Sequence, residues 1–174
     1  MSKVLVVFYS LTGTSRNVAK LLCAQQDWHM AEVTEAHGRA GGWGNLRCVL
    51  ESLFRLRPPV RYSGPAPEDF DSVVLVSPIW LMRLAGPMRS FVVTYRKRLP
   101  QVAVVSVMGG SGGPNAPAEI ARLLGRAPAL STTFTAREVN DGSCAARLQA
   151  FGAALASVQG AQEPVRPVRP VQFA

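Results

Sequence analysis

Short apolar runs, separated by longer amphipathic segments, set the pattern of this chain. Three runs are almost continuously hydrophobic, at residues 4–9, 73–76 and 102–107. β-Branched runs of this length, bounded by Gly, Ser or Pro, are typical of parallel strands that are covered on both faces. Two weaker runs, at 28–34 and 129–136, predict two further strands.

Helical periodicity fills the segments between these runs. In 14–26 the apolar side chains of Val18, Leu21 and Leu22 recur at the spacing that places them on one face of a helix. Leucine and valine recur in the same way in 46–56. Further helices are expected at 87–98, 116–124 and 143–158.

The alternation of five strands with five helices predicts an α/β fold, with a doubly wound parallel sheet between two helical layers. Such sheets bind ligands in the crevice beyond the carboxyl ends of their strands. The chain is expected to form one domain over 1–160, with a Gly-rich loop at 37–45. The Val-Arg-Pro repeats of 161–174 predict an extended tail, because proline prevents a regular helix.

Composition narrows the choice of partners. Nineteen Lys and Arg against eleven Asp and Glu give a formal net charge of +8, which favours anionic partners. The arginines are scattered, and no recognition helix, RNP-like run or zinc-finger spacing is present, so a nucleic-acid partner is not favoured. The three cysteines form no CxxC pair, which argues against a disulfide framework or a cysteine metal site and suggests small buried side chains.

The start of the chain and its apolar runs bear on localisation. A strand that begins near Lys3 leaves no room for a signal peptide. No apolar run reaches the roughly 18 residues that a membrane span requires. The expectation is a cytoplasmic protein without a membrane span.

The segment that joins the first strand to its helix is rich in hydroxyl groups. It reads Ser10-Leu11-Thr12-Gly13-Thr14-Ser15. Backbone N–H groups at a helix N-terminus attract anions, and Gly13 lets the backbone approach a ligand closely. The segment has neither the lysine of a Walker A loop nor a GxGxxG pattern. It predicts a terminal monophosphate held by hydrogen bonds alone, and the alternative is that its hydroxyl groups merely cap the helix.

This segment resembles the T/S-x-T-G-x-T/S phosphate signature of flavodoxins, in the same position after the first strand. The resemblance extends over residues 3–158. It implies a flavodoxin-like fold with strand order 2-1-3-4-5, and FMN as the cofactor with its phosphate at Ser10–Ser15.

A second segment, at 77–87, resembles the Pro-Ile-Trp loop that lies beside the flavin ring in flavodoxins. The residues that the resemblance places at the cofactor are Pro78, Ile79, Trp80, Leu81, Met82 and Arg83. It implies that Trp80 stacks on the ring, as suits a flat, rigid side chain. The alternative is that Trp80 packs into the core. Arg83 either contacts the flavin or an incoming anionic group, or faces solvent.

A third segment follows the strand at 102–107. The residues expected at the cofactor are Gly109, Gly110, Ser111 and Gly112. In flavodoxin relatives a loop at this place lies along the other edge of the flavin. Dense glycine permits backbone approach to a ligand, and the alternative is a flexible turn with no ligand.

Two departures from an electron carrier favour a reductase. Flavodoxins that carry single electrons are typically acidic, and many hold the flavin between two aromatic rings; this chain has a charge of +8 and no aromatic residue in the third segment. Relatives with a glycine-rich third loop include NAD(P)H:quinone reductases. The hypothesis is an FMN-dependent NAD(P)H oxidoreductase that reduces a quinone or similar acceptor.

Two other functions stay open. One is an electron-transfer protein that serves an acidic redox partner, and the other is an interaction domain that binds no flavin. A homo-oligomer is also left open. No catalytic side chain is predicted, because the cofactor would carry the redox chemistry. His29 and His37 have no partner at a suggestive spacing, and Asp141 and Glu119 are expected near the ligand side without an assigned role. No metal site is predicted.

Overall fold

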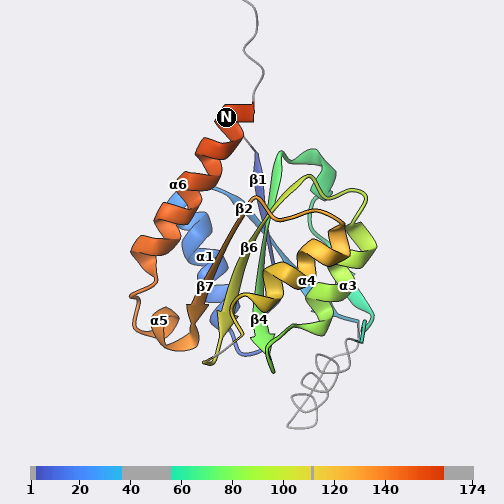
Figure 1. Ribbon diagram of the computed structural model, residues 1–174, viewed down its shortest axis with the longest axis horizontal. Coiled ribbons are helices and arrows are strands. Elements are labelled where there is room, and N and C mark those ends of the chain that lie inside the picture. Colours follow the sequence, from blue (N-terminus) through green and yellow to red (C-terminus); the bar gives the residue numbers. More distant parts are fainter. Residues whose placement is uncertain (1–2, 37–55, 111, 163–174) are drawn as a thin grey trace, which may run out of the picture.

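A computed structural model describes residues 3–36, 56–110 and 112–162 of the chain. Its described strands form one seven-stranded sheet with helices on both faces (Figure 1). The strands are β1 (Val4–Phe8), β2 (His29–Glu35), β3 (Val60–Tyr62), β4 (Ser72–Trp80), β5 (Arg83–Leu84), β6 (Gln101–Met108) and β7 (Leu130–Thr135).

The centre of the sheet is parallel, in the order β2-β1-β4-β6-β7. This order is equivalent to 2-1-3-4-5, so the predicted fold class is confirmed. Two short antiparallel strands were not predicted: β3 pairs with the edge of β2, and β5 pairs with the end of β4. In Figure 1 the strands β4, β6 and β7 end at the same edge of the sheet, at the bottom of the view.

Helices cover both faces of the sheet. They are α1 (Thr14–Gln26), α3 (Gly86–Tyr95), α4 (Asn115–Leu124), α5 (Ala136–Asn140) and α6 (Ala145–Gln162), with a 3-10 turn η1 (Pro67–Asp69). The helices α1 and α6 lie on one face, and α3 and α4 lie on the other (Figure 1). Among the described residues, none of the helices combines the length and the hydrophobicity that crossing a bilayer takes.

Alternation along the buried strands divides the core into two layers. On β1, Leu5 and Val7 face α3 and α4, whereas Val4, Val6 and Phe8 face α1 and α6. Both sets are buried, which explains why the strand reads as a continuous apolar run rather than an alternating one. Each such side chain contributes about 1.5–3 kcal/mol on burial.

The expected boundaries need several corrections. The strand predicted at 73–76 continues to Trp80, so Pro78 belongs to β4 and not to a loop. Proline is tolerated there because β1 ends at Phe8, opposite Val76, which leaves β4 an open edge beyond that point. The short helix α5 was not predicted, and the helix expected at 143–158 is α6, which spans Ala145–Gln162.

Some predictions fall on residues that the structure does not describe. The helix at 46–56 lies outside the described residues except for Leu56, which is not helical. The loop at 37–45, residue Ser111 and the tail from 163 onward also lie outside them. Cys144 is buried as predicted, and Cys23 is half-buried.

Candidate functional site

The three predicted segments meet at the carboxyl edge of the sheet, because they follow β1, β4 and β6, which are neighbours. The backbone N–H of Tyr9 donates to the carbonyl oxygen of Val76 at 3.1 Å, which joins the ends of β1 and β4. Pairing of β4 with β6 continues as far as Ile79 and Met108. The sequence therefore brings its unusual loops together at one edge, as a doubly wound sheet requires.

In the first segment, Gly13 has a left-handed backbone with φ 93°, a conformation that favours glycine. It caps α1, so within the described residues no side chain caps this helix. The hydroxyl of Ser10 accepts a hydrogen bond from the N–H of Gly13 at 3.1 Å, and those of Thr12 and Thr14 lie 3.3 Å apart. The helix-capping alternative is therefore wrong for α1.

This geometry suits an anion. The first turn of α1 holds no acidic residue, and the space beside Gly13 is open, with no atom within 4 Å of the position that a Cβ would take. Leu11 and Thr12 continue the segment at the surface, whereas Ser15 is buried in the first turn of α1. A phosphate at this helix N-terminus would meet backbone donors and hydroxyl groups without a competing carboxylate.

The second segment is a tight β-hairpin and not an irregular loop. Trp80 pairs with Arg83, and Ile79 pairs with Leu84. The two residues between them, Leu81 and Met82, both have positive φ, at 46° and 62°. Positive φ at both positions is the backbone of a type I′ turn, which favours Asn and Gly, so Leu81 and Met82 occupy a strained turn.

Trp80 lies partly buried against the core at the base of this hairpin. Its ring meets that of Tyr9 edge to face, with centroids 5.9 Å apart and an angle of 81° between planes. Tyr9 is buried, and its hydroxyl donates to Oε1 of Glu35 at 2.6 Å. The core-packing alternative for Trp80 is thus partly correct, and its stacking on a flavin stays a prediction.

The third segment packs directly against the hairpin. Gly112 has φ 98°, and a Cβ built on it would lie only 2.6 Å from the Cα of Met82. The side-chain N–H of Asn115, at the start of α4, donates to the carbonyl oxygen of Met82 at 2.8 Å. Gly112 and Asn115 therefore hold the strained turn in place.

The other two glycines of this segment have no such packing role. Gly109 and Gly110 are exposed, and a Cβ on either would meet no atom within 4 Å. No side chain covers the backbone of Gly109 and Gly110 after β6. A flat ligand can approach it closely.

Solved structures of other proteins share the fold of this chain. No protein-family model matches the chain, and no curated protein does. A flavoprotein from Lactobacillus acidophilus NCFM, solved in complex with FMN, is 17% identical over 82% of this chain and 99% of its own, with a TM-score of 0.68. A WrbA-like flavodoxin from Agrobacterium tumefaciens is 12% identical over 94% of this chain and 100% of its own, with a TM-score of 0.59.

A third structure is a flavodoxin from Fusobacterium nucleatum bound to flavin mononucleotide. It is 9% identical over 91% of this chain and 99% of its own, with a TM-score of 0.58. The chain has a flavodoxin-like fold. These matches cover between 82% and 94% of the chain.

Behind the hairpin, the flavodoxin-like core holds a buried ion pair. Nε of Arg89 on α3 lies 2.6 Å from Oε1 of Glu119 on α4. Oε2 of Glu119 accepts the N–H of Leu84 at 3.3 Å, and Nη2 of Arg89 donates to the carbonyl oxygen of Leu84 at 2.8 Å. Both helices are thereby tied to β5, which is one arm of the hairpin.

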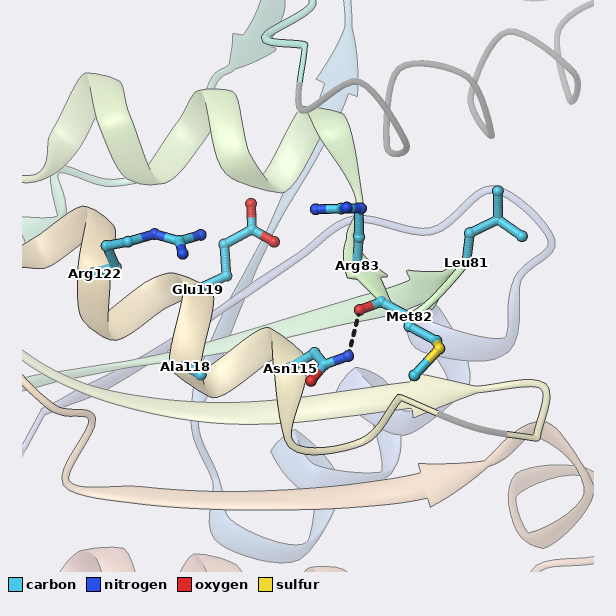
Figure 2. Close-up of a pocket in the computed structure, with 7 residues that line it drawn as sticks. All are labelled: Leu81, Met82, Arg83, Asn115, Ala118, Glu119 and Arg122. Atoms are coloured by element: carbon cyan, nitrogen blue, oxygen red, sulfur yellow. Dashed lines mark hydrogen bonds between the residues drawn. The ribbon is translucent and has the colours of Figure 1, made fainter.

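A pocket of about 460 Å³ opens between the hairpin and α4 (Figure 2). Its walls are Leu81, Met82, Arg83, Asn115, Ala118, Glu119 and Arg122. Arg83, one of the predicted site residues, is half-buried here rather than free in solvent. Of the lining residues on α4, Glu119 was expected near the ligand side without an assigned role, and Asn115, Ala118 and Arg122 were not predicted.

Four residues of the site were missed by the sequence reasoning. They are Tyr9, Arg89, Asn115 and Arg122. Tyr9 was assigned to a strand, although its place next to Ser10 was a signal that it lies at the carboxyl edge. Arg89 and Asn115 bond to residues about thirty positions away, and Arg122 faces the hairpin across a pocket, so no local pattern indicates these three residues.

Proposed function

We propose that this protein binds FMN at the carboxyl edge of its sheet and uses it as an NAD(P)H-dependent oxidoreductase, reducing a quinone or similar acceptor. The observation that carries the proposal is the start of α1, where left-handed Gly13 leaves the helix N-terminus without a side-chain cap. The solved relatives with FMN support the same cofactor. Bound FMN would supply the redox chemistry, and the chain would position it.

The phosphate of FMN would lie at Ser10–Ser15. The backbone donors at the start of α1 and the hydroxyl groups of Thr12 and Thr14 would hold it. The hydroxyl groups of Thr12 and Thr14 lie 3.3 Å apart, and either can donate to the other. The hydroxyl that accepts still has its own O–H to donate to a phosphate. The absence of an acidic residue in the first turn of α1 removes the repulsion that a dianion would meet.

The flavin ring would lie between the hairpin and the glycine segment. Trp80, braced by Tyr9, would flank the ring from the hairpin side. Gly109 and Gly110 would bring bare backbone to the other edge. The hairpin has a fixed position because Gly112 and Asn115 hold Met82, and a fixed wall is what orientation of a ring against its substrate requires.

Reductase function is favoured by what the glycine segment leaves uncovered. It offers no aromatic side chain, so one face of a bound ring would be open to a nicotinamide or a quinone. Direct stacking of that kind is what hydride transfer needs. The charge of +8 would attract the phosphate groups of the donor.

The second candidate is an electron-transfer protein that docks to a partner. The tip of the hairpin favours it, because Leu81 and Met82 are 55% and 53% exposed beside the candidate site. Exposed apolar side chains around a cofactor are a feature of docking surfaces. An electron-transfer protein would need a separate reductase, whereas the proposed enzyme would not.

An absorbance experiment separates these functions. The purified protein is mixed with FMN, freed of unbound flavin, and then treated with NADPH or NADH without oxygen. Retained flavin whose absorbance band bleaches within seconds supports the reductase. Retained flavin that stays oxidised with both nucleotides contradicts the reductase and supports the carrier, and no retained flavin contradicts both.

A further inference from the structure

Two arginines face the pocket between the hairpin and α4, which we call the arginine pocket. Arg83 comes from β5 and Arg122 from α4, and Figure 2 shows both side chains extending toward Glu119 from opposite sides. Within the part of the chain that the structure describes, neither arginine forms an ion pair or a hydrogen bond. Both guanidinium groups are therefore available to a ligand.

The wall from α4 is a single face of that helix. Ala118, Glu119 and Arg122 lie three, four and seven residues after Asn115, which places all four on one face of the helix. Asn115 fixes the near end of this face, because its amide donates to Met82 in the hairpin. The distance between the two walls is thus set by a hydrogen bond and by the packing of Gly112.

Glu119 does not neutralise the pocket. Its side chain is 7% exposed, and its carboxylate lies 2.6 Å from the guanidinium of Arg89, a buried cation that balances its charge. Its second oxygen accepts the backbone N–H of Leu84. With Glu119 occupied in this way, Arg83 and Arg122 leave the arginine pocket with an excess of positive charge.

A phosphate group is the ligand that this chemistry fits. Guanidinium groups present several N–H donors in a plane and bind phosphate oxygens in pairs. The volume of about 460 Å³ falls in the range of small-molecule sites and is larger than a free phosphate needs. A phosphate carried on a nucleotide fills it better. The apolar side chains of Leu81, Met82 and Ala118 supply a surface for the attached sugar or base.

We propose that the arginine pocket binds the 2′-phosphate of NADPH and so makes the protein prefer NADPH over NADH. The inference rests on the proposed function, because the hairpin residues Leu81–Arg83 both line this pocket and border the candidate flavin site. In this proposal, a dinucleotide with its nicotinamide at the open face of the flavin would extend across the hairpin into the pocket. Arg122 and Arg83 are then specificity-determining residues.

Binding tests the pocket without any redox reaction. The FMN-treated protein is titrated by calorimetry with adenosine 2′,5′-bisphosphate and with adenosine 5′-monophosphate, which lacks the 2′-phosphate. We expect the bisphosphate to bind about tenfold more tightly, as a charge-assisted phosphate contact warrants. Equal affinities, or no binding of either compound, would overturn the proposal.

Variants assign the effect to the arginines. Arg122→Gln and Arg83→Gln should each reduce the affinity for the bisphosphate about tenfold. The matched control is Arg96→Gln, which removes the same charge from an exposed residue at the far end of α3. If Arg96→Gln and Arg122→Gln lose the same affinity for the bisphosphate, net charge alone attracts the ligand. The assignment of the 2′-phosphate to the arginine pocket would then be wrong. Arg122 is exposed on α4, so its replacement is not expected to disturb folding.

Reduction kinetics separate this inference from the proposed function. If NADPH bleaches the flavin faster than NADH, and Arg122→Gln abolishes that preference, both hold. If neither nucleotide bleaches the flavin but the bisphosphate still binds through Arg122, the reductase is wrong and the specificity role fails with it. Reduction by both nucleotides at rates that Arg122→Gln and Arg83→Gln leave in the same ratio contradicts the inference alone.

Discussion

Nε of Arg89 lies 2.6 Å from Oε1 of Glu119, and these two charged side chains are only 2% and 7% exposed. They join α3 to α4, the two helices on the same face of the sheet. Arg89 also donates to the carbonyl oxygens of Leu84 and Leu56, at 2.8 and 3.0 Å. The ion pair is therefore buried beneath the hairpin. Each charge compensates for the hydration that the other loses on burial.

Arg89→Met is predicted to destabilise the protein strongly. It leaves the Glu119 carboxylate buried without its cation, and breaking a buried pair in this way costs about 3–5 kcal/mol. Urea unfolding followed by circular dichroism would show a lower midpoint with an unchanged slope. A second variant, Arg89→Met with Glu119→Leu, should recover much of the loss because no unpaired charge remains.

The matched control is the surface pair Arg98–Glu68, whose atoms lie 3.3 Å apart with both side chains exposed. Replacing Arg98 by Met should cost no more than about 1 kcal/mol, because water screens an exposed pair. Equal losses for Arg89→Met and Arg98→Met would show that burial does not strengthen the inner pair.

Much of the fold follows from hydrophobic spacing alone. The apolar runs that form β1, β4 and β6 have hydrophobic side chains on both faces. Only a strand covered by helices on both sides buries all of these side chains. The first segment was also predictable, since Gly13 and its neighbouring hydroxyls lie next to each other in sequence. Local patterns report local structure.

The hairpin shows where the sequence stops being informative. Leu81 and Met82 occupy positive-φ positions that normally call for Gly or Asn, so no turn signal marks them. Their conformation is imposed by Gly112 and Asn115, some thirty residues later in the chain. Arg89 and Glu119 are likewise separated by 30 positions, and only the folded sheet brings them together.

Gly112→Ala is predicted to displace the hairpin. Its Cβ would lie 2.6 Å from the Cα of Met82, and its φ of 98° is strained for alanine. The two effects together should lower the free energy of unfolding by about 1–3 kcal/mol and weaken FMN retention. Gly109→Ala is the control for stability alone, because its Cβ would meet no atom within 4 Å. If Gly112→Ala and Gly109→Ala unfold at the same temperature, Gly112 does not have this packing role.

Gly13→Ala is predicted to weaken FMN binding beyond its effect on stability. Alanine at φ 93° costs about 1–2 kcal/mol, although the space beside Gly13 is open. Gly125→Ala is matched to it, with φ 72° at the end of α4, open space around its Cβ, and no place in the candidate site. Both should lose similar stability in urea, but only Gly13→Ala should bind FMN more weakly in a fluorescence titration. Equal FMN affinities of Gly13→Ala and Gly125→Ala would contradict the proposal that the phosphate binds at Ser10–Ser15.

A reciprocal capping box at the start of α5 provides a pH-dependent contribution to stability. The carboxylate of Glu138 accepts the backbone N–H of Thr135 at 2.7 Å, and the N–H of Glu138 donates to the Thr135 hydroxyl at 3.2 Å. Arg147 lies 2.6 Å from the same carboxylate. These bonds, led by the one from the Thr135 backbone, lower the pKa of Glu138 from its usual 4.5.

Because the folded-state pKa of Glu138 is lowered, the unfolded chain binds the proton more readily. The stabilisation is therefore complete above the unfolded-state value of 4.5 and is lost as the pH falls through the lower folded-state value. Glu138→Gln should show a smaller decline in the urea midpoint than the parent protein between about pH 5 and about pH 2. Asp141→Asn supplies a comparison, since that carboxylate accepts the N–H of Ser143 at 3.0 Å and its pKa is lowered as well. If the decline in Glu138→Gln matches that of the parent, the capping box does not contribute to acid sensitivity.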